Sequence, residues 1–452
     1  MAALGAVSLA VPAAAEAGQG LEPTLGLQLA QASSVSAATR AEYDRTFQAV
    51  LRDPGNLDLT FRFAELAVEV GDLEGAIGAL ERLLVFNPDL PRVRLELGVL
   101  YYRLGSHQAA KAYLEQALAA PNAPAEVRER VRPLIAEIDR SLTTSHFFGA
   151  VQLGTRYQTD ANAATATGNV KLFGLDATLS SEFLKQHDSN GFIVGNLGYI
   201  YDLGNQAGDA IESNLRLVAT RQFRLTSLDL GFLEADVGPR FHPFERMPGL
   251  SLRPYAVGGA VTLGEALYYK GGGGGLSLDT PLTRALAVNL DGEGRARWFH
   301  NTASRSTSTD KNGPETVGRL TARYALSPVA AVVAAFEFVR DASQADNERN
   351  NQYGVTVAYN RQFSAPFRLT RLPWSFSLNA GRVWREYAGP DSSVDPDVTR
   401  HDREWSVGGS LTAGLFGRWS ATLQVQQQWV NSALVNFAYR NSAVSLALGY
   451  AF

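Results

Sequence analysis

The feature that most constrains the fold is a two-residue alternation of apolar with polar or small side chains, which recurs from about residue 147 to the end of the chain. In the last nine residues, every second position is apolar: Val444, Leu446, Leu448, Tyr450 and Phe452. Because successive side chains of a strand point to opposite faces, these five would form one apolar stripe. A single stripe also suits a soluble β-sandwich, so the prediction depends on how often the pattern repeats.

The alternation marks fourteen strand-like segments between Ser145 and Phe452. They begin near residues 147, 191, 209, 228, 250, 266, 284, 316, 329, 351, 373, 403, 418 and 440. Bacterial single-chain barrels use an even number of strands, and no uncharged apolar run of about 18 residues follows residue 20. We therefore predict an antiparallel transmembrane β-barrel of about 14 strands over residues 145–452. Its end resembles the assembly signal that the barrel insertion machinery recognises, carried here by Tyr450 and Phe452.

One predicted strand carries charges on its polar face, with Glu293, Arg295 and Arg297 on one parity and Leu290 and Trp298 on the other. A dry core would hold such a ladder only at a high free-energy cost, whereas a water-filled lumen could pair opposite charges on neighbouring strands. An exposed soluble sheet would also hold the charges, but it would not explain the repeated apolar stripes. The residues expected to line the lumen are Arg216, Glu293, Arg295, Arg297, Arg319, Arg323, Gln424, Gln426 and Gln428.

A run of five glycines, Gly271–Gly275, lies inside another predicted strand. No Gly-Lys-Ser/Thr follows it, so a phosphate-binding loop is not indicated. In a strand, such a run permits sharp bending or close contact between neighbouring backbones. We therefore interpret it as a feature of the barrel wall.

The amino terminus differs in character from the rest of the chain. Residues 1–17 are predicted to be a secretory signal peptide, because an Ala/Leu/Val run ends in the small-x-small site Ala15-Glu16-Ala17. The basic start of such a signal is missing, and the first arginine is Arg40, which suggests a truncated start. A disordered alanine-rich tail is the alternative. Residues 18–37 are predicted to be a flexible lead-in.

Between residues 38 and 141 the periodicity becomes helical and repeats at a spacing of 34 residues, which aligns Gly71 with Gly105 and Ala76 with Ala110. This period is that of the tetratricopeptide repeat. The glycines would end the first helix of each unit, and the small residues would let two helices approach closely. Proline would close the units, at Pro54, Pro88 and Pro121. We predict an α-helical tetratricopeptide solenoid that ends in a charged capping helix.

Solenoids of this type bind peptides or proteins along the concave face formed by their first helices. By the positional pattern of the repeat, the client-binding groove would contain Phe61, Glu65, Glu69, Arg92, Leu95, Val99, Tyr102 and Arg103. The alternative is that these are ordinary solvated or core residues of the helices. Nothing in this region resembles a catalytic constellation.

Composition excludes several other classes of function. The formal charge of −4 argues against nucleic acid as a partner. The chain has no cysteine, which removes thiolate metal sites, cysteine nucleophiles and a lipidated cysteine. Its six histidines show no paired ligand spacing. We therefore predict a protein that is not an enzyme and that has no catalytic residues, metal site or cofactor.

The order of segments resembles the surface lipoprotein assembly modulator family. The most specific match is the opening strand at residues 147–163, with its glycine-rich start, the pair Arg156-Tyr157 and the turn at Asn162-Ala163. The resemblance covers about residues 40–452. The chain departs from the family in its short repeat domain and its glycine-rich sixth segment.

The resemblance implies a function in the outer membrane of a Gram-negative cell, with the helical domain in the periplasm. The barrel would move a protein client, a surface lipoprotein or a secreted binding protein, from the periplasm to the cell surface, and the repeat domain would dock it. The implied partners are this client, outer-membrane lipids, the barrel insertion machinery and periplasmic chaperones. Two alternatives stay open: an exopolysaccharide export barrel with a tetratricopeptide scaffold, and a passive porin.

Overall fold

The computed structural model describes residues 37–53, 55–120, 124–142, 144–165, 167–205, 207–244, 247, 249–264 and 266–452. The predicted signal peptide, most of the lead-in, Pro54 and Pro121 lie outside the described residues. The chain divides into a helical unit and a β-barrel unit, each of which is compact. None of the helices in the described segments combines the length and apolar content that crossing a membrane requires.

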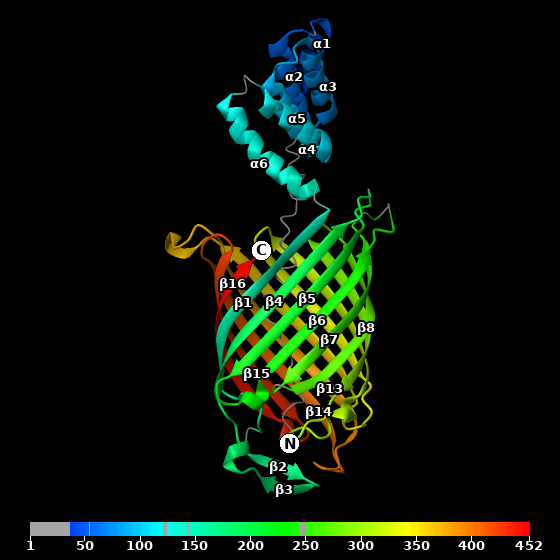
Figure 1. Cartoon of the computed structure of the whole chain (residues 1–452), viewed down its shortest axis with the longest axis vertical. Coiled ribbons are helices and arrows are strands. Elements are labelled where there is room, and N and C mark those ends of the chain that lie inside the picture. Colours follow the sequence, from blue (N-terminus) through cyan, green and yellow to red (C-terminus); the bar gives the residue numbers. More distant parts are fainter. Residues whose placement is uncertain are drawn as a thin grey trace. The chain divides into compact units, whose positions relative to one another are not determined.

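Six helices form the helical unit, which is blue to cyan in Figure 1. They are α1 (Ala37–Arg52), α2 (Leu57–Val70), α3 (Leu73–Phe86), α4 (Pro91–Arg103), α5 (His107–Ala119) and α6 (Ala125–Leu142). The paired order of α2 with α3 and α4 with α5 is that of two tetratricopeptide units followed by a further helix, α6, as the sequence predicts.

Local chemistry fixes where these helices begin and end. The side chain of Asn56 accepts a hydrogen bond from Leu59 N at 3.1 Å, and that of Asp72 accepts one from Gly75 N at 2.9 Å, so both satisfy free N–H groups at a helix start. Gly71 ends α2 in the left-handed conformation, with φ of 86°. Gly105 follows α4 with φ of 74°. The prediction that glycine ends the first helix of each unit is therefore confirmed.

Small residues bring the helix pairs together. Ala76 and Ala110 are fully buried, and a Cβ on Gly98 would lie 2.5 Å from Leu114 Cγ. A larger residue at these positions would force the helices apart, as the sequence pattern predicts.

Glu81 ties α3 to the second unit. It accepts hydrogen bonds from the hydroxyls of Tyr101 at 2.7 Å and Tyr113 at 2.9 Å, whose rings stack 5.4 Å apart. The hydrogen bond to Glu81 raises the pKa of Tyr101 to about 12.

The second unit is a closed antiparallel β-barrel of 14 strands, which confirms the predicted fold class (Figure 1). Its strands are β1 (Ser145–Gln158), β4 (Asp188–Asp202), β5 (Ala210–Gln222), β6 (Leu230–Arg240), β7 (Ser251–Leu263), β8 (Ala266–Pro281), β9 (Leu286–Phe299), β10 (Gly313–Ser327), β11 (Ala330–Asp341), β12 (Asn350–Phe363), β13 (Trp374–Pro390), β14 (Thr399–Gly414), β15 (Trp419–Ser432) and β16 (Tyr439–Ala451). Each predicted start lies within four residues of an observed one. β1 pairs with β16 and closes the barrel.

The two ends of the barrel differ in their connections. At the terminal end, where β1 begins and β16 ends, the connections are residues 203–209, 241–250, 282–285, 328–329, 364–373 and 415–418. At the opposite or loop end they are residues 159–187, 223–229, 264–265, 300–312, 342–349, 391–398 and 433–438. The long connection at residues 159–187 contains the hairpin β2 (Asn169–Leu172) and β3 (Leu175–Thr178), which the sequence did not predict.

This hairpin is held against two other loop-end connections. Phe173 N donates to Ser393 O at 3.0 Å, and Lys171 N donates to Asn436 Oδ1 at 2.8 Å. The first connection therefore folds back onto its neighbours instead of extending freely.

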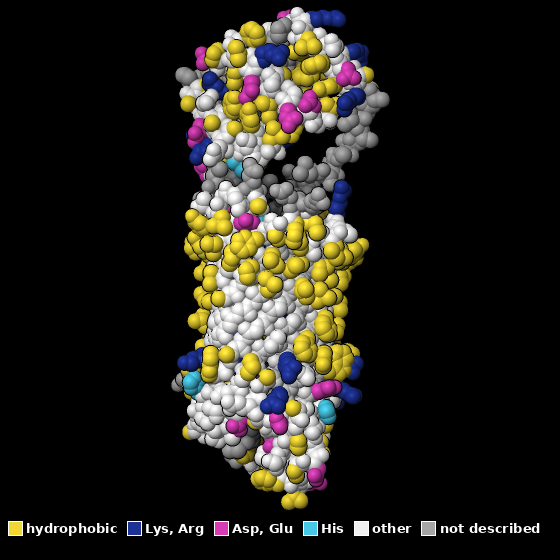
Figure 2. Space-filling view, turned by 90° about the vertical axis from the view of Figure 1, so that its right-hand side faces the viewer, with side chains coloured by type: hydrophobic (Ala, Val, Ile, Leu, Met, Phe, Trp, Pro, Cys, Tyr) yellow, Lys and Arg dark blue, Asp and Glu magenta, His cyan; other side chains and the backbone are white. Residues whose placement is uncertain are grey.

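The outward faces of the strands form an apolar band, seen as yellow side chains on the barrel in Figure 2. Val444, Leu446 and Leu448 of the predicted terminal stripe are 47%, 59% and 54% exposed. Exposed apolar side chains at this density, on one parity of many strands, are typical of a surface that faces lipid. A β-barrel with such a band is consistent with an outer-membrane protein.

Candidate functional site

Side-chain contacts identify the inner face of the barrel. Arg295 Nη1, on β9, donates to Glu234 Oε2 at 2.7 Å, although Glu234 lies on β6, three strands away. Side chains that meet across three strands of a closed barrel must converge from its concave inner surface. The row that contains Glu293, Arg295 and Arg297 therefore faces the lumen.

Opposite charges pair between strands along this inner face. Arg297 Nη1 donates to Glu315 Oε2 at 2.9 Å, and its Nη2 lies 2.5 Å from Asp341 Oδ1. Arg319 Nη2 donates to Glu337 Oε2 at 2.6 Å. These contacts join β9, β10 and β11 by side chains as well as by backbone hydrogen bonds.

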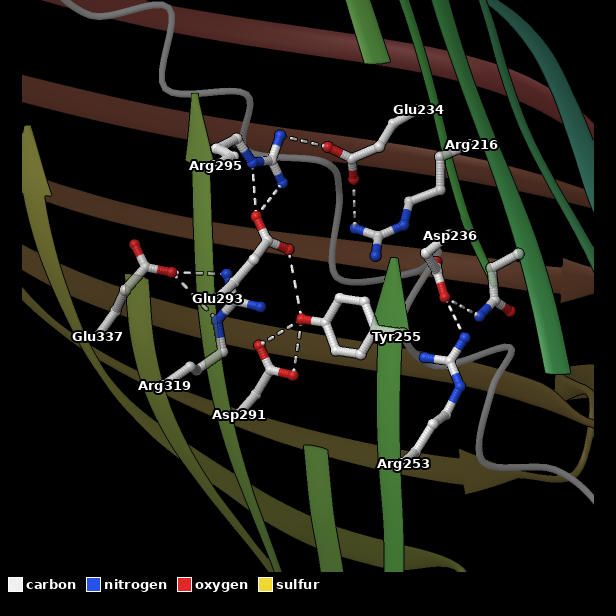
Figure 3. Close-up of polar contacts among 11 residues, drawn as sticks. Arg216, Glu234, Asp236, Arg253, Tyr255, Asp291, Glu293, Arg295, Arg319 and Glu337 are labelled. Carbon is white, nitrogen blue, oxygen red and sulfur yellow. Dashed lines mark hydrogen bonds and ion pairs between the residues drawn. The ribbon is translucent and has the colours of Figure 1, made fainter. Parts of the chain in front are cut away.

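A tyrosine crosses the glycine-rich strand to reach this charged row (Figure 3). Tyr255, on β7, places its hydroxyl 3.1 Å from Asp291 Oδ2 and 3.3 Å from Glu293 Oε2, both on β9. Gly275 of β8 lies between them, as the register partner of both Tyr255 and Glu293. A Cβ on Gly275 would lie 2.3 Å from Tyr255 Cζ, so the phenol ring lies where any other residue would place its side chain.

Alternate glycines leave the inner surface of β8 free of side chains over residues 271–275. Gly271, Gly273 and Gly275 share the lumen-facing parity, and a Cβ on Gly273 would lie 2.9 Å from Arg295 Cβ. The glycine run thus permits close contact, as predicted, but the contact is made by side chains that reach over it from β6, β7 and β9.

The central part of this charged wall is a chain of ion pairs, drawn in Figure 3. Arg216 Nη1 lies 3.7 Å from Glu234 Oε1, and Glu234 also accepts from Arg295. Arg295 Nε in turn donates to Glu293 Oε1 at 2.5 Å. Because Glu234 and Glu293 both have a cationic partner, their charges are held in place at the lumen surface.

The predicted glutamine row lies on a different wall and carries no charge of its own. Gln424 and Gln426 are register partners of Ser410 and Gly408 on β14. Gln428 donates from Nε2 to Glu404 Oε1 at 2.7 Å, nearer the loop end. Away from the loop end, this wall therefore offers amide and hydroxyl groups to the lumen, where β6–β9 offers ionised ones.

Arg323 lies on the lumen-facing parity of β10, like Arg319. Its side chain is exposed, and it makes no ion pair with any described residue. Of the predicted lumen cations, Arg323 is thus the one that no described carboxylate neutralises.

The predicted groove residues of the helical unit lie on α2 and α4. Glu65 and Glu69 are exposed on α2, and Phe61 is half-buried against the core of the first unit. On α4, Arg103 is exposed, and Arg92 lies 3.6 Å from Glu126 of α6 in an exposed ion pair.

Leu95 is not a wall of an open groove, contrary to the prediction. It is 2% exposed and packs in a core with Val127, Val131 and Ile138 of α6. The capping helix α6 covers this part of α4, because the apolar face of α6 packs against Leu95. Val99 and Tyr102 are half-buried against the same core and keep only part of their surface accessible.

Sequence reasoning missed several residues of both surfaces. In the lumen these are Glu212, Glu234, Asp236, Arg253 and Tyr255. The spacing of the glycines could have located them, since alternate glycines on an inner face leave room for side chains from the flanking strands. In the helical unit, Val85 and Phe86 at the end of α3 are 80% and 60% exposed and were not singled out.

The predicted assembly signal closes the barrel at the terminal end. Phe452 N donates to Gly149 O at 2.9 Å, and Gly149 N donates to Phe452 O at 3.1 Å. The ring of Tyr450 lies 5.0 Å from that of Trp419 on the outward face. The last residue thus completes the seam between β16 and β1.

Comparisons with known proteins concern the helical unit. Residues 64–136 match the tetratricopeptide repeat family. No curated protein matches the chain. The type III secretion chaperone SycD of Yersinia enterocolitica, solved with a peptide of the translocator YopD, is 15% identical over 24% of this chain and 83% of its own, with a TM-score of 0.22. The Sgt2 TPR domain from Aspergillus fumigatus is 22% identical over 24% of this chain and 72% of its own, with a TM-score of 0.20. Likenesses this low carry no argument about function.

The chain thus combines tetratricopeptide repeats with an outer-membrane-type barrel. This combination fits a role in secretion or translocation in general, and a repeat domain of this type fits binding of a protein partner.

Proposed function

We propose that this chain is an outer-membrane translocator that moves a protein client from the periplasm to the cell surface. Its helical domain lies in the periplasm and docks the client. The observation that carries the proposal is the pairing, in one chain, of a peptide-binding type of solenoid with a barrel whose lumen is polar along its walls. The resemblance of residues 147–163 to surface lipoprotein assembly modulators supports the same class of client.

The lumen would give an extended client two kinds of surface. Glu234, Glu293 and Arg295 offer fixed charges, while Gln424 and Gln426 offer neutral donors and acceptors. Backbone groups of a client could exchange hydrogen bonds with the amide wall in place of water. No catalytic group is needed, and folding of the client outside would give the movement its direction by mass action.

The proposal includes partners at each step. Periplasmic chaperones deliver the client, which is a surface lipoprotein or a secreted binding protein. The barrel insertion machinery assembles the chain in the outer membrane through the motif at Tyr450 and Phe452.

Of the two alternatives, the porin has an observation in its favour. The exposed and unpaired Arg323, together with the charged wall, would also suit passage of small anions. An exopolysaccharide exporter is less well supported, because such systems carry much longer helical arrays than α1–α6.

The groove is tested by a triple variant, Arg92→Glu, Tyr102→Ala and Arg103→Glu. We expect surface display of a secreted protein encoded beside the gene of this chain to fall severalfold, with barrel level unchanged, since the two exposed charge reversals cost only roughly 0.5 kcal/mol each. The matched control reverses two other exposed cations of the helical unit, Arg82→Glu and Arg128→Glu.

Two outcomes would contradict the groove assignment. The first is normal export by the triple variant together with normal export by a chain that lacks residues 38–141, which would favour the porin. The second is an equal loss of export in the control. An Ala76→Leu variant provides a further reference, because overpacking by about 1–3 kcal/mol should unfold the repeat itself.

A further inference from the structure

The tryptophans of the barrel are divided between its two ends, and their cross-strand partners differ. Four lie toward the loop end, and each faces a cation as its direct partner in the strand register. These pairs are Trp298 with Lys270, Trp384 with Arg403, Trp405 with Arg382 and Trp429 with Arg440. Trp374 and Trp419, at the terminal end, instead face Phe363 and Tyr450.

These four cations point outward and not into the lumen. Arg382 shares its parity with Leu378, which is 57% exposed on the lipid-facing side of β13. Trp298 and Trp405 are 50% and 43% exposed, whereas the opposite parity of β14 carries Asp402, which is buried. In Figure 2, dark-blue side chains accordingly lie along the lower edge of the yellow band.

Arg382 is held between two indole rings. Its guanidinium carbon lies 4.7 Å from the ring centroid of Trp384 and 4.4 Å from that of Trp405. The Nε atom is buried and has no hydrogen-bond partner among the described residues. Stacking fixes the plane of the guanidinium, and no described carboxylate forms an ion pair with it.

The cations that face the other three tryptophans also have no carboxylate partner among the described residues. No ion pair with a described residue involves Lys270, Arg403 or Arg440. Arg340 points outward on β11, between β8 and β13, and likewise forms no ion pair within the described segments. Together these outward cations form a loop-end cation belt. The lumen arginines of β9, in contrast, are all matched with carboxylates.

We propose that the loop-end cation belt, formed by Lys270, Arg340, Arg382, Arg403 and Arg440, binds the phosphate groups of lipid A in the outer leaflet. Tryptophan prefers the interface between hydrocarbon and headgroups, so it places each cation at headgroup depth. A planar guanidinium matches a phosphate by two parallel hydrogen bonds. The belt lies at one end only, so it would bind one leaflet and fix the orientation of the barrel in the membrane.

The test measures lipid binding to the purified full chain in neutral detergent by native mass spectrometry. The probes are bisphosphorylated lipid A, its dephosphorylated form and a neutral phospholipid. We expect retention of bisphosphorylated lipid A alone. In the triple variant R382Q, R403Q and R440Q, its affinity should fall by on the order of 100-fold, because each cation near an anionic leaflet contributes roughly fivefold.

The matched control is R361Q. Arg361 is an outward, exposed cation at the terminal end, opposite Phe376, and its loss should leave binding unchanged. Equal binding of the phosphorylated and dephosphorylated lipids to the unaltered chain would overturn the proposal without any variant, as would equal binding by the triple variant. Competition by inorganic phosphate at millimolar concentration would show that the site takes free phosphate and not the lipid.

Discussion

The strands β6–β9 and β14–β16 present the same kind of apolar outer face, but their lumen faces differ. On β6–β9, charged and phenolic side chains reach across strands, as Tyr255 does over Gly275. On the part of β14–β16 away from the loop end, amide and hydroxyl side chains contact near neighbours, as when the hydroxyls of Thr412 and Thr422 lie 3.0 Å apart. The alternation of apolar residues fixes only the lipid face, so the lumen face is free to vary between these two kinds of wall.

Glycine makes the difference between the two walls. Where the inner face of a strand carries a side chain, contacts are made with its immediate neighbours, about 5 Å away, and a long side chain such as that of Arg297 reaches one strand further, to Asp341. Where Gly271, Gly273 and Gly275 leave that face empty, a side chain on one flanking strand meets one on the other. The charged wall is therefore cross-linked over four strands, whereas the side-chain contacts of the neutral wall join adjacent strands.

The largest expected effect comes from filling the glycine gap. In Gly275→Leu the new Cβ would lie 2.3 Å from Tyr255 Cζ and 2.8 Å from Gly292 O, so the ring must leave its carboxylates. Overpacking of this kind costs about 1–3 kcal/mol and occasionally more. We expect most of the chain to fail to form the compact, heat-sensitive species in gel electrophoresis. Gly272→Leu is the matched control, because Gly272 faces outward and its Cβ would lie 3.6 Å from Val257 O; equal loss in both variants would contradict the role of the gap.

The next effect comes from removing the cation at the centre of the charged wall. Arg295→Met leaves Glu234 and Glu293 without their shared partner. Breaking a largely buried pair costs roughly 3 kcal/mol, less where lumen water reaches the carboxylates. Urea unfolding in detergent should show a loss of about 2 kcal/mol, part of which Glu234→Gln restores in the double variant. A double variant less stable than the single one would show that the two groups are not coupled.

A smaller, local effect is expected at Asp160, which lies beyond β1 on the neutral side. Its Oδ1 accepts from Ala164 N at 3.1 Å, but its buried Oδ2 has no partner among the described residues. Burial raises the pKa of Asp160 to about 6. Since the folded pKa is raised, the protonated form stabilises the loop at low pH, and this contribution is lost as the pH rises through about 6.

Hydrogen exchange measures this effect. After correction for intrinsic rates, amides of residues 161–184 should exchange faster at pH 7.5 than at pH 5, by an opening free energy on the order of 1–2 kcal/mol. Asp160→Asn should abolish the difference, and a difference that persists would rule out this carboxyl as its cause.

The smallest effect is expected on the neutral wall itself. Gln426→Met removes one amide opposite Gly408, with no charge left unpaired. The free energy of unfolding should change by less than about 0.5 kcal/mol. A loss as large as that of Arg295→Met would show that the neutral wall is also a coupled network.

The outer face of the barrel was predictable because it depends on a period of two and on turn positions, both of which are local. The inner contacts were less so: the pairing of Glu234 with Arg295 depends on strand register over 61 residues of sequence. The covering of Leu95 by α6 likewise depends on which face of a capping helix packs, which repeat spacing does not encode.

The most direct test of the proposed function uses neighbouring residues of β15 that face opposite ways. A photo-crosslinking amino acid is placed at Gln426, in the lumen, or at Val425, which is 49% exposed on the lipid face. The client is the secreted protein encoded beside the gene, fused to a stable domain that stalls it during export. A crosslink from position 426 and none from position 425 is the predicted result. Crosslinks from 425 alone, or from neither while the client still reaches the surface, would contradict passage of a protein through this barrel.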